Sequence, residues 1–258
     1  MQILVTNDDG VYADGLWALA RELKSVGDVI ISAPDRDQSG KGTSVTLDRP
    51  LRLNKIAPLL DGVQAYSVEG TPGDSVILAL RHAVKNKVDL VISGINEGPN
   101  LGNDTFISGT VGAAMQGYFY GIPSIAVSVA AFQDVHFDVA AEMAKLLAEA
   151  AASGGIPERM LLNVNLPNLP REKIKGIEVT RLGERNYMDK VDTGHDGKRQ
   201  YYWIVRGIPE WGVHPGSDIW ALEQDKISIS SFPDVYNGYN SDSLKKLASE
   251  IFRKLNHK

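Results

Sequence analysis

The chain of 258 residues carries 27 Lys and Arg against 32 Asp and Glu, a net charge of -5, and 43% of its residues are apolar. This length and composition fit a chain with a sizeable core, as one large α/β domain or as a domain with an appendage. The acidic balance argues against binding to a nucleic-acid polymer or a membrane surface, because both need an excess of basic side chains. The absence of cysteine excludes disulfides, thiolate metal sites and a cysteine nucleophile.

The amino-terminal segment shows no targeting signal. It runs straight into Gln2-Ile3-Leu4-Val5-Thr6, without the charged segment and long apolar core of a signal peptide. No apolar run approaches the roughly 18 residues needed to cross a bilayer. We therefore expect a soluble, cytoplasmic protein.

The first part of the chain alternates short apolar runs with helical patterns. The β-branched apolar runs predict strands at residues 3–6, 29–32, 64–68, 89–93 and 124–129. Apolar residues at helical spacing predict helices from about residue 14, after Thr71-Pro72, and at residues 109–120 and 137–152. Thr71 would cap its helix, with Pro72 at the first helical position.

This alternation determines the expected fold class. Strands that are apolar on both faces are typical of a parallel sheet covered by helices on each side. Right-handed crossovers then give a doubly wound, mostly parallel, Rossmann-like sheet, whose ligands bind beyond the carboxyl ends of the strands.

The second part of the chain changes character. Strands are expected at residues 161–165, 177–182 and 201–205, and the polar stretch 192–198 between the last two predicts a turn in an antiparallel hairpin arm. Such an arm serves oligomerisation or is simply a solvent-exposed excursion, and the sequence does not choose between the two. Residues 241–255 predict a terminal amphipathic helix, with Leu244, Leu247, Ile251 and Leu255 on one face.

Two adjacent carboxylates follow the first predicted strand, in Asn7-Asp8-Asp9-Gly10. Carboxylates this close repel each other, and a divalent cation relieves that cost. An Asx turn leading into the helix would explain one aspartate but not both. The pair therefore favours a metal site.

Two further loops at predicted strand ends are polar and rich in glycine. In residues 33–44, Gly40 and Gly42 let backbone N–H groups approach an anion, and Ser39 offers a hard oxygen ligand, although this loop taken by itself is more typical of a flexible surface loop. The stretch 93–104 carries several asparagines, including Asn96, whose carbonyl oxygens suit magnesium or manganese. Its length exceeds the usual 2–6 residues of such loops, which favours a functional role over a plain turn.

The third loop leads into Ser108-Gly109-Thr110, which opens a helix. Free N–H groups, the positive end of the helix dipole and two hydroxyls predict a phosphate-binding cradle, whereas capping of the helix is the simpler alternative. The cradle, both aspartates, Ser39 and Asn96 should lie at one edge of one sheet.

Several common active-site signatures are missing. The sequence contains no P-loop, no G-x-G-x-x-G after the first strand and no G-x-S-x-G, and its five histidines show no metal-ligand spacing. His195 and His214 are as consistent with surface positions as with a substrate site.

Five ordered motifs give the chain a resemblance to the SurE (survival protein E) family of metal-dependent 5′/3′-nucleotidases. The resemblance covers about the first 130 residues. The motifs are Ile3-Leu4-Val5-Thr6-Asn7-Asp8-Asp9-Gly10, Ala33-Pro34-Asp35-Arg36-Asp37-Gln38-Ser39-Gly40, Gly70-Thr71-Pro72-Gly73-Asp74, the segment 93–102 and Ser108-Gly109-Thr110-Val111-Gly112-Ala113-Ala114. A looser match follows in Gly216-Ser217-Asp218 and Ile227-Ser228-Ile229-Ser230.

The resemblance implies that Asp8, Asp9, Ser39 and Asn96 bind one divalent cation per subunit, Mg²⁺ or Mn²⁺. It also implies hydrolysis of nucleoside 5′- and 3′-monophosphates, with some activity on short polyphosphates. It implies a single domain over residues 1–258, with a Rossmann-like core at 1–170. The hairpin arm, a late core strand and the terminal helix would follow at 171–258, and the arm and helix would assemble homodimers or homotetramers.

The expected chemistry is metal-assisted hydrolysis of a phosphate monoester. Asp8 or Asp9 would orient or deprotonate the attacking water. The phosphate would be bound by Asn96 and by four further residues that offer N–H groups or hydroxyls, Gly40, Ser108, Gly109 and Thr110.

Two other functions remain open. Asp35-x-Asp37 is compatible with a metal-dependent nucleotide-sugar glycosyltransferase, although that reading leaves Asp8 and Asp9 unexplained. A non-catalytic nucleotide sensor would bind nucleotide tightly without releasing phosphate.

Overall fold

The computed structural model describes residues 1–155, 157, 159–187, 190–205 and 209–232. The terminal helix expected at residues 241–255 lies outside these ranges. No helix in the described part of the chain has the length and apolar character of a membrane span.

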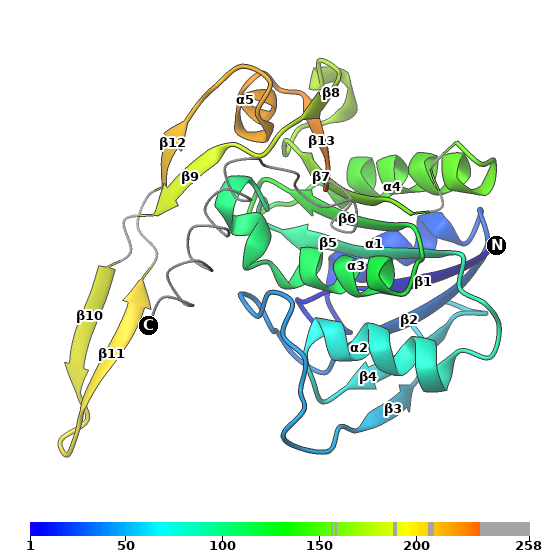
Figure 1. Cartoon of the computed structure of the whole chain (residues 1–258), viewed down its shortest axis with the longest axis horizontal. Coiled ribbons are helices and arrows are strands. Elements are labelled where there is room, and N and C mark those ends of the chain that lie inside the picture. The colour runs from blue at the N-terminus through cyan, green and yellow to red at the C-terminus, as the bar shows by residue number, and fades with distance from the viewer. Residues whose placement is uncertain (156, 158, 188–189, 206–208, 233–258) are drawn as a thin grey trace, which may run out of the picture.

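A nine-stranded sheet forms the centre of the molecule (Figure 1), in the order β3-β4-β2-β1-β5-β6-β7-β13-β8. Its six central strands, β4 to β7 in that order, are parallel. Their bounds are β1 Gln2–Thr6, β2 Asp28–Pro34, β4 Gln64–Val68, β5 Leu90–Glu97, β6 Ser124–Val129 and β7 Leu161–Leu166. All six strands were predicted, and the mostly parallel α/β fold is confirmed.

The chain winds in both directions from β1. It adds β2 and β4 on one side of β1, and β5, β6 and β7 on the other. The strand order therefore reverses between β1 and β5, which is where open α/β sheets bind ligands. Asp8 follows β1 at this point.

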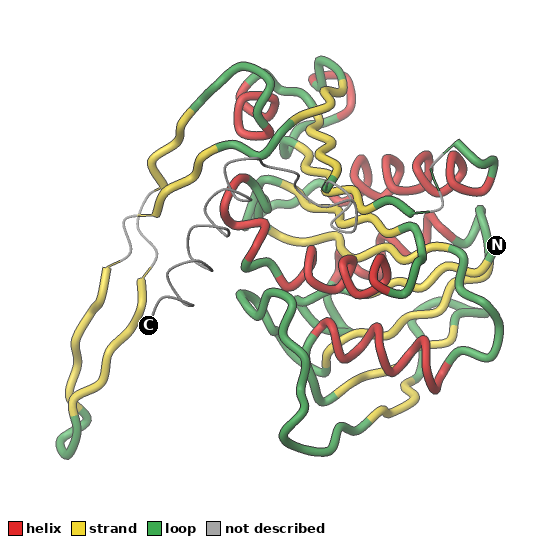
Figure 2. The backbone as a smooth tube through the Cα atoms, in the orientation of Figure 1, coloured by secondary structure: helices red, strands yellow, loops and turns green. Residues whose placement is uncertain are grey.

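In the described part of the chain, two pairs of helices lie on opposite faces of the sheet (Figures 1 and 2). α1 (Asp14–Leu23) and α4 (Phe137–Ala152) pack together on one face, and α2 (Pro72–Leu78) and α3 (Gly109–Phe119) on the other. Alternate strand residues serve the two faces, as in Ile3 and Val5 toward α1 and α4 but Leu4 toward α2 and α3. The core thus consists of two apolar layers, one on each side of the sheet.

On the face opposite α1 and α4, the apolar layer does not reach the carboxyl ends of the strands. Small polar side chains replace it there, all of them at most 2% exposed. This buried polar row comprises Thr6, Ser32, Ser93, Ser128, Asn163, Asn165, Ser228 and Ser230. Buried polar groups usually find hydrogen-bond partners. In this row, Ser128, Asn163 and Asn165 contact Asn100 in the loop above, whereas the hydroxyls of Thr6 and Ser93 have no partner among the described residues.

Several elements were not predicted. β3 (Leu53–Ile56) pairs antiparallel to β4 at one edge of the sheet, and α2 continues as a π-helical turn, η1 (Ala79–Ala83). The other edge, by contrast, holds two strands that were expected: β8 (Ile177–Thr180), predicted at 177–182, and the late core strand, β13 (Ile227–Ser231), which lies between β7 and β8. α5 (Asp218–Glu223) precedes β13, and two short 3-10 helices complete the set, η2 (Gly102–Phe106) and η3 (Arg171–Lys173).

The expected antiparallel hairpin is present as two consecutive ribbons that extend away from the sheet (Figures 1 and 2). β9 (Glu184–Tyr187) pairs with β12 (Pro209–Gly212), and β10 (Lys190–His195) pairs with β11 (Gln200–Val205). The turn is shorter than predicted, since Asp192 to His195 belong to β10 despite their polar character. Cross-strand pairing of the exposed ribbon keeps these residues extended.

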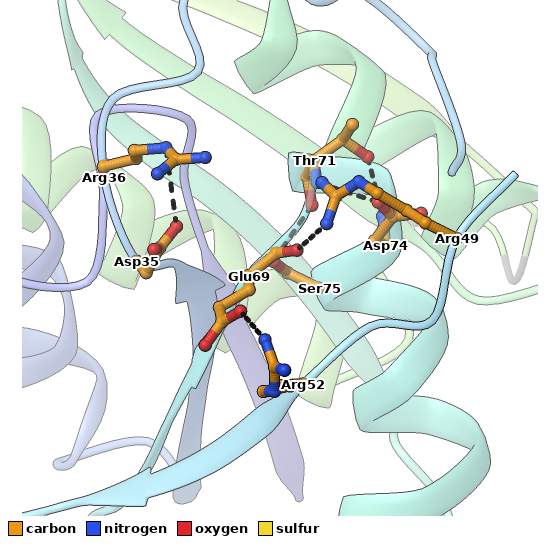
Figure 3. A network of polar contacts seen from close by, with 8 residues as sticks. All are labelled: Asp35, Arg36, Arg49, Arg52, Glu69, Thr71, Asp74 and Ser75. Atoms are coloured by element: carbon orange, nitrogen blue, oxygen red, sulfur yellow. Dashed lines mark hydrogen bonds and ion pairs between the residues drawn. The ribbon is translucent and has the colours of Figure 1, made fainter. Parts of the chain in front are cut away.

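The motif at residues 70–74 builds the start of α2 (Figure 3). The Thr71 side chain accepts a hydrogen bond from the Asp74 N–H, and Asp74 accepts one from the Thr71 N–H, which is the reciprocal capping box. Asp74 also accepts from the N–H and the hydroxyl of Thr46, at 2.9 and 2.7 Å. Nearby, Arg52 lies 2.8 Å from Glu69. Asp74 therefore fastens the loop that precedes β3 to the start of α2.

We expect Asp74→Ala to lower the free energy of unfolding by about 2–4 kcal/mol, because it removes a helix cap and leaves partly buried donors of Thr46 unpaired. Urea denaturation measures this change. Asp138→Ala is the matched control. Asp138 also lies in the first turn of a helix, but it is exposed, and the N-cap residue of its helix, His136, makes no side-chain cap. Its cost should stay under about 1 kcal/mol, and equal losses for both variants would contradict the role given to Asp74.

Candidate functional site

A cavity of about 330 Å³ opens beside the carboxyl ends of β1, β2 and β5. Its volume falls within the roughly 300–1,000 Å³ range of small-molecule sites. The lining residues are Asp8, Ser39, Gly40, Asn96, Glu97, Gly98, Pro99, Asn100, Asp104, Ile107, Ser108 and Phe132. Five of the predicted site residues thus converge on one cavity, whereas Asp9, Gly109 and Thr110 lie outside its lining.

Asp8 is buried against the first turn of α3. Its carboxylate accepts a hydrogen bond of 2.5 Å from the Thr110 hydroxyl, and its side chain is only 3% exposed. Gly109 leaves no room for a larger residue, because a Cβ there would lie 2.7 Å from Asp8 Cβ and 2.8 Å from Oδ2. Burial raises the pKa of Asp8, and the hydrogen bonds from Thr110 oppose that rise. The strand end and the helix start are therefore in direct contact through this carboxylate.

Thr110 was expected to contact phosphate directly. Its side chain is instead fully buried, with the hydroxyl donated to Asp8. This placement does not support a direct contact, and it gives Thr110 the task of orienting a carboxylate. Ser108 caps α3 by accepting from the Val111 N–H at 3.2 Å, yet it also lines the cavity, so capping and a role in the site coexist.

Asp9 lies in a group of negative charges. Burial raises its pKa to about 8, and the neighbouring carboxylates of Asp8, Asp37 and Glu97 contribute to the rise. A divalent cation bound beside these groups would offset their repulsion. The electrostatics of the site therefore fit a cation.

The loop that carries Ser39 and Gly40 is held at three points. The Gln38 N–H donates to the Asp8 carbonyl at 2.8 Å, and the Gly42 N–H donates to the Ile107 carbonyl at 3.0 Å. The third point is the contact between Thr46 and Asp74. Within the loop, Asp37 accepts from both the N–H and the hydroxyl of Ser39, at 2.8 and 2.6 Å. A loop of this composition would be mobile by itself, and these bonds fix it over the cavity.

Asn96 belongs to β5 and not to the loop that follows it. β5 extends to Glu97 because it resumes pairing with β6 after an irregularity between Ser93 and Asn96, where the Gly94–Ile95 peptide bond is cis. The expected loop at 93–104 is therefore shorter than predicted. The Asn96 amide donates to the Gly98 carbonyl at 2.8 Å, which leaves its own carbonyl oxygen available to a ligand.

Asn100 anchors the rest of this loop to the buried polar row. Its amide donates to the Ser128 hydroxyl at 2.9 Å, and its N–H donates to the Asn165 side chain at 2.8 Å. Its carbonyl accepts from the side chains of Asn163 and Asn165, at 2.8 and 3.1 Å. The two β7 asparagines lie more than 60 residues away in sequence, and no local pattern pointed to them.

Asp218 is the second anchor that the sequence did not reveal. Its fully buried carboxylate accepts from the backbone N–H groups of Gly102, Gly183 and Ile219, at 2.8, 2.7 and 2.8 Å. Burial raises its pKa, while these bonds act in the opposite direction. Gly102 begins η2 and Gly183 directly precedes the arm, so one carboxylate joins the cavity loop to the root of the arm. The distal Gly-Ser-Asp motif was the available signal.

A cation at this site would need neutral oxygen ligands in addition to carboxylates. Among the described residues, no three His, Asp or Glu side chains are placed to hold a metal together. Two adjacent carboxylates, the Ser39 hydroxyl and the Asn96 carbonyl are the oxygen ligands that Mg²⁺ and Mn²⁺ prefer. Neither His195 nor His214 belongs to the cavity lining, since His195 lies in the arm and His214 is exposed elsewhere.

The fold and this cavity define an α/β protein that binds a small ligand at the switch point of its sheet, between acidic oxygens and the start of a helix. The chain belongs to the SurE family. The family model described as "Survival protein SurE" matches residues 3–189.

Individual relatives agree with this assignment. A protein of Dehalococcoides mccartyi named 5′-nucleotidase SurE is 49% identical over 233 residues, which cover 90% of this chain and 88% of that protein. A protein of the same name from Vibrio parahaemolyticus is 46% identical, with 89% and 87% covered. The crystal structure of the SurE protein from Aquifex aeolicus superposes with a TM-score of 0.75 at 41% identity, covering 90% of this chain and 93% of that one.

The raised pKa of Asp9 predicts a pH-dependent stability. The carboxyl titrates near 3.8 in the unfolded chain and near 8 in the metal-free folded protein, so the folded state binds more protons between these values. The free energy of unfolding should therefore fall as the pH rises through this range. Asp9→Asn cannot ionise, and in EDTA its stability relative to wild type should increase by roughly 1 kcal/mol or more from pH 5 to pH 8.

Urea denaturation at both pH values tests this expectation. Added Mg²⁺ or Mn²⁺ should weaken the pH dependence of the wild type and leave Asp9→Asn unchanged. A stability difference between the two proteins that stays constant with pH would show that Asp9 is not in the electrostatic environment described.

Proposed function

We propose that the chain is a divalent-metal-dependent phosphatase that hydrolyses nucleoside 5′- and 3′-monophosphates. The main support is that Asp8, Ser39, Asn96 and the N-cap of α3 line one cavity at the switch point. Relatives that are 46–49% identical over about nine-tenths of this chain carry the name 5′-nucleotidase, which supports the same activity here. Short polyphosphate remains a further candidate substrate.

The proposed metal site consists of Asp8, Asp9, Ser39 and Asn96, which together hold one Mg²⁺ or Mn²⁺. Such a cation supplies positive charge beside the phosphate and acts as a Lewis acid. Thr110 orients the Asp8 carboxylate through its hydroxyl, and Asp37 orients Ser39. The fit rests on the oxygen donors and on the crowding of negative charge around Asp9.

The chain's own groups bind and orient the substrate. In the proposal, the backbone N–H groups of Gly40 and Gly109 and the hydroxyl of Ser108 donate to phosphate oxygens, where the dipole of α3 also favours negative charge. Asn96 is assigned both to the cation and to the phosphate. Asp8 or Asp9 accepts the proton of the attacking water. Phosphoryl transfer needs mainly positioning and charge stabilisation, and these groups provide both.

The glycosyltransferase alternative has less support. Neither Asp35 nor Asp37 lines the cavity. The Asp37 carboxylate is engaged with Ser39, and Asp35 lies 4.0 Å from the guanidinium of Arg36. The contact with Ser39 accounts for Asp37, and the position of both aspartates outside the cavity lining gives the Asp-x-Asp spacing no support as a nucleotide-sugar site.

Phosphate release from a panel of nucleoside 5′- and 3′-monophosphates tests the proposal. Turnover should require Mg²⁺ or Mn²⁺ and stop in EDTA. Asp9→Asn should lower kcat/KM by at least about 100-fold, more than is usual for residues that only support a ligand. Asp35→Asn is the matched control and should retain activity within about 2-fold.

One outcome would contradict the phosphatase activity and another the assigned metal site. Tight nucleotide binding without phosphate release would identify a sensor. Metal-dependent turnover that survives in Asp9→Asn but not in Asp35→Asn would move the metal site to the Asp-x-Asp segment.

We further propose that the arm assembles the protein into a homodimer or homotetramer. β10 and β11 carry a group of apolar side chains that the rest of the described chain leaves exposed, including Trp203 at 66% and Ile204 at 77%. Exposed apolar patches of this kind mark interaction surfaces. A second copy of the chain is the partner that the family resemblance implies.

Sedimentation velocity of the full chain checks the assembly. The wild type should sediment as a multiple of the 28.1 kDa chain, and Ile204→Asp should shift it toward the monomer. Leu59→Asp introduces the same charge at an apolar residue that is 63% exposed outside the arm, and it should sediment like the wild type. A monomeric wild type, or equal behaviour of both variants, would contradict a role of the arm in assembly.

A further inference from the structure

An exposed aromatic ring stands at the rim of the cavity. Phe132 follows β6, is 73% exposed and lines the same cavity as Asp8, Ser39 and Asn96. An aromatic side chain in water forgoes the free energy that burial of its apolar surface would contribute. A large ring left exposed at this position therefore calls for an explanation.

The ring rests on the backbone of Gly98. A Cβ on Gly98 would overlap with carbons of the Phe132 ring, and the φ of Gly98 is +103°, a value that side chains disfavour. Gly98 is itself fixed, since its N–H donates to the Val129 carbonyl at 2.9 Å and its carbonyl accepts from Asn96. The support beneath the ring is thus the segment that orients a predicted metal ligand.

The loop that carries Phe132 is held at its far side as well. The Asn168 side chain accepts from the His136 N–H at 2.8 Å and donates to the Asp134 carbonyl at 3.0 Å. At the near side, the Ala131 N–H donates to the Val129 carbonyl at 2.8 Å. These bonds hold the backbone on both sides of the ring, so the ring is positioned before a ligand arrives.

The lining of the cavity combines two kinds of surface. Asp8, Ser39 and Ser108 supply charged and polar oxygens, while Pro99 and Phe132 supply apolar surface. A nucleoside monophosphate is built in the same way, with a phosphate at one end and a flat base at the other. We propose that Phe132 is the stacking platform for the nucleobase, an inference that rests on the proposed nucleotidase function.

This platform predicts a broad choice of base. Every base has a π-face, so stacking tolerates all of them, whereas discrimination needs hydrogen bonds to the edges of the base. The nearby Asn100 amide donates to Ser128 and so does not offer that hydrogen bond to the edge of a base. The structure thus assigns to Phe132 a preference for a nucleoside over a bare sugar phosphate, and little preference among purines and pyrimidines.

Steady-state kinetics of the metal-loaded full chain test the proposal. The substrates are the 5′-monophosphates of adenosine, guanosine, cytidine and uridine, together with ribose 5-phosphate, which has no base. Phe132→Ala should lower kcat/KM for all four nucleotides by about 5-fold to 150-fold, mainly through KM. This range corresponds to roughly 1–3 kcal/mol per stacked base, at about 1.4 kcal/mol per tenfold. Hydrolysis of ribose 5-phosphate should change less than about 2-fold.

Two further variants make the test specific. Phe132→Tyr should restore the nucleotide kinetics, because it keeps the ring. Phe106→Ala removes a phenylalanine that is 64% exposed but does not line the cavity, and it should behave like the wild type. Sedimentation velocity should give the same mass for Phe132→Ala and the wild type.

The results separate the two proposals. Equal losses for ribose 5-phosphate and nucleotides, unchanged nucleotide kinetics in Phe132→Ala, loss for one base alone, or a changed oligomeric mass would each overturn the stacking role. A wild-type protein that releases phosphate from none of the five substrates would instead overturn the nucleotidase function itself.

Discussion

The carboxylate of Asp8 is buried against the first turn of α3, and the arrangement of the site follows from this contact. It brings the end of β1 to the start of a helix more than 100 residues later, with Thr110 donating at 2.5 Å and Gly109 leaving space for the carboxylate. The Asp8 carbonyl then holds the next loop through the N–H of Gln38. A buried charge is costly unless it is hydrogen-bonded or paired. A cation in the cavity would therefore reduce the electrostatic cost of keeping this carboxylate charged.

Around this contact, the cavity is formed by loops whose backbones are hydrogen-bonded to buried side chains. Asp74 holds the loop before β3, Asn163 and Asn165 hold the segment at Asn100, and Asp218 holds Gly102. With the exception of Asn100, these residues do not line the cavity. Their contribution is preorganisation, since polar groups aimed at a charged substrate stabilise it most when they need not move. Asp218 also contacts the root of the arm, so the cavity loop and the proposed assembly element share one support.

Much of this arrangement was predictable from sequence. Hydrophobic periodicity located the six parallel strands and the four main helices, and the parallel order placed their polar loops at one edge of the sheet. The supporting residues were not predictable, because Asn163, Asn165 and Asp218 act on backbone groups 60 to 120 residues away. Asn96 was assigned to a loop because asparagine and glycine favour turns, whereas pairing with β6 keeps it in a strand. The placement of Thr110 depended on packing between β1 and α3, which no local pattern encodes.

The buried polar row divides the sheet along the direction of its strands. Toward the amino ends, mostly apolar side chains cover both faces, while toward the carboxyl ends of the parallel strands, serine, threonine and asparagine replace them on one face. The apolar contacts of that face are thereby concentrated away from the cavity. A lineage that carries this sheet can alter the loops above the polar half, and so change its substrates, while the apolar half keeps the domain folded. The same polarity limits that freedom, because a new loop would have to replace the hydrogen bonds that Asn100 makes with Ser128, Asn163 and Asn165.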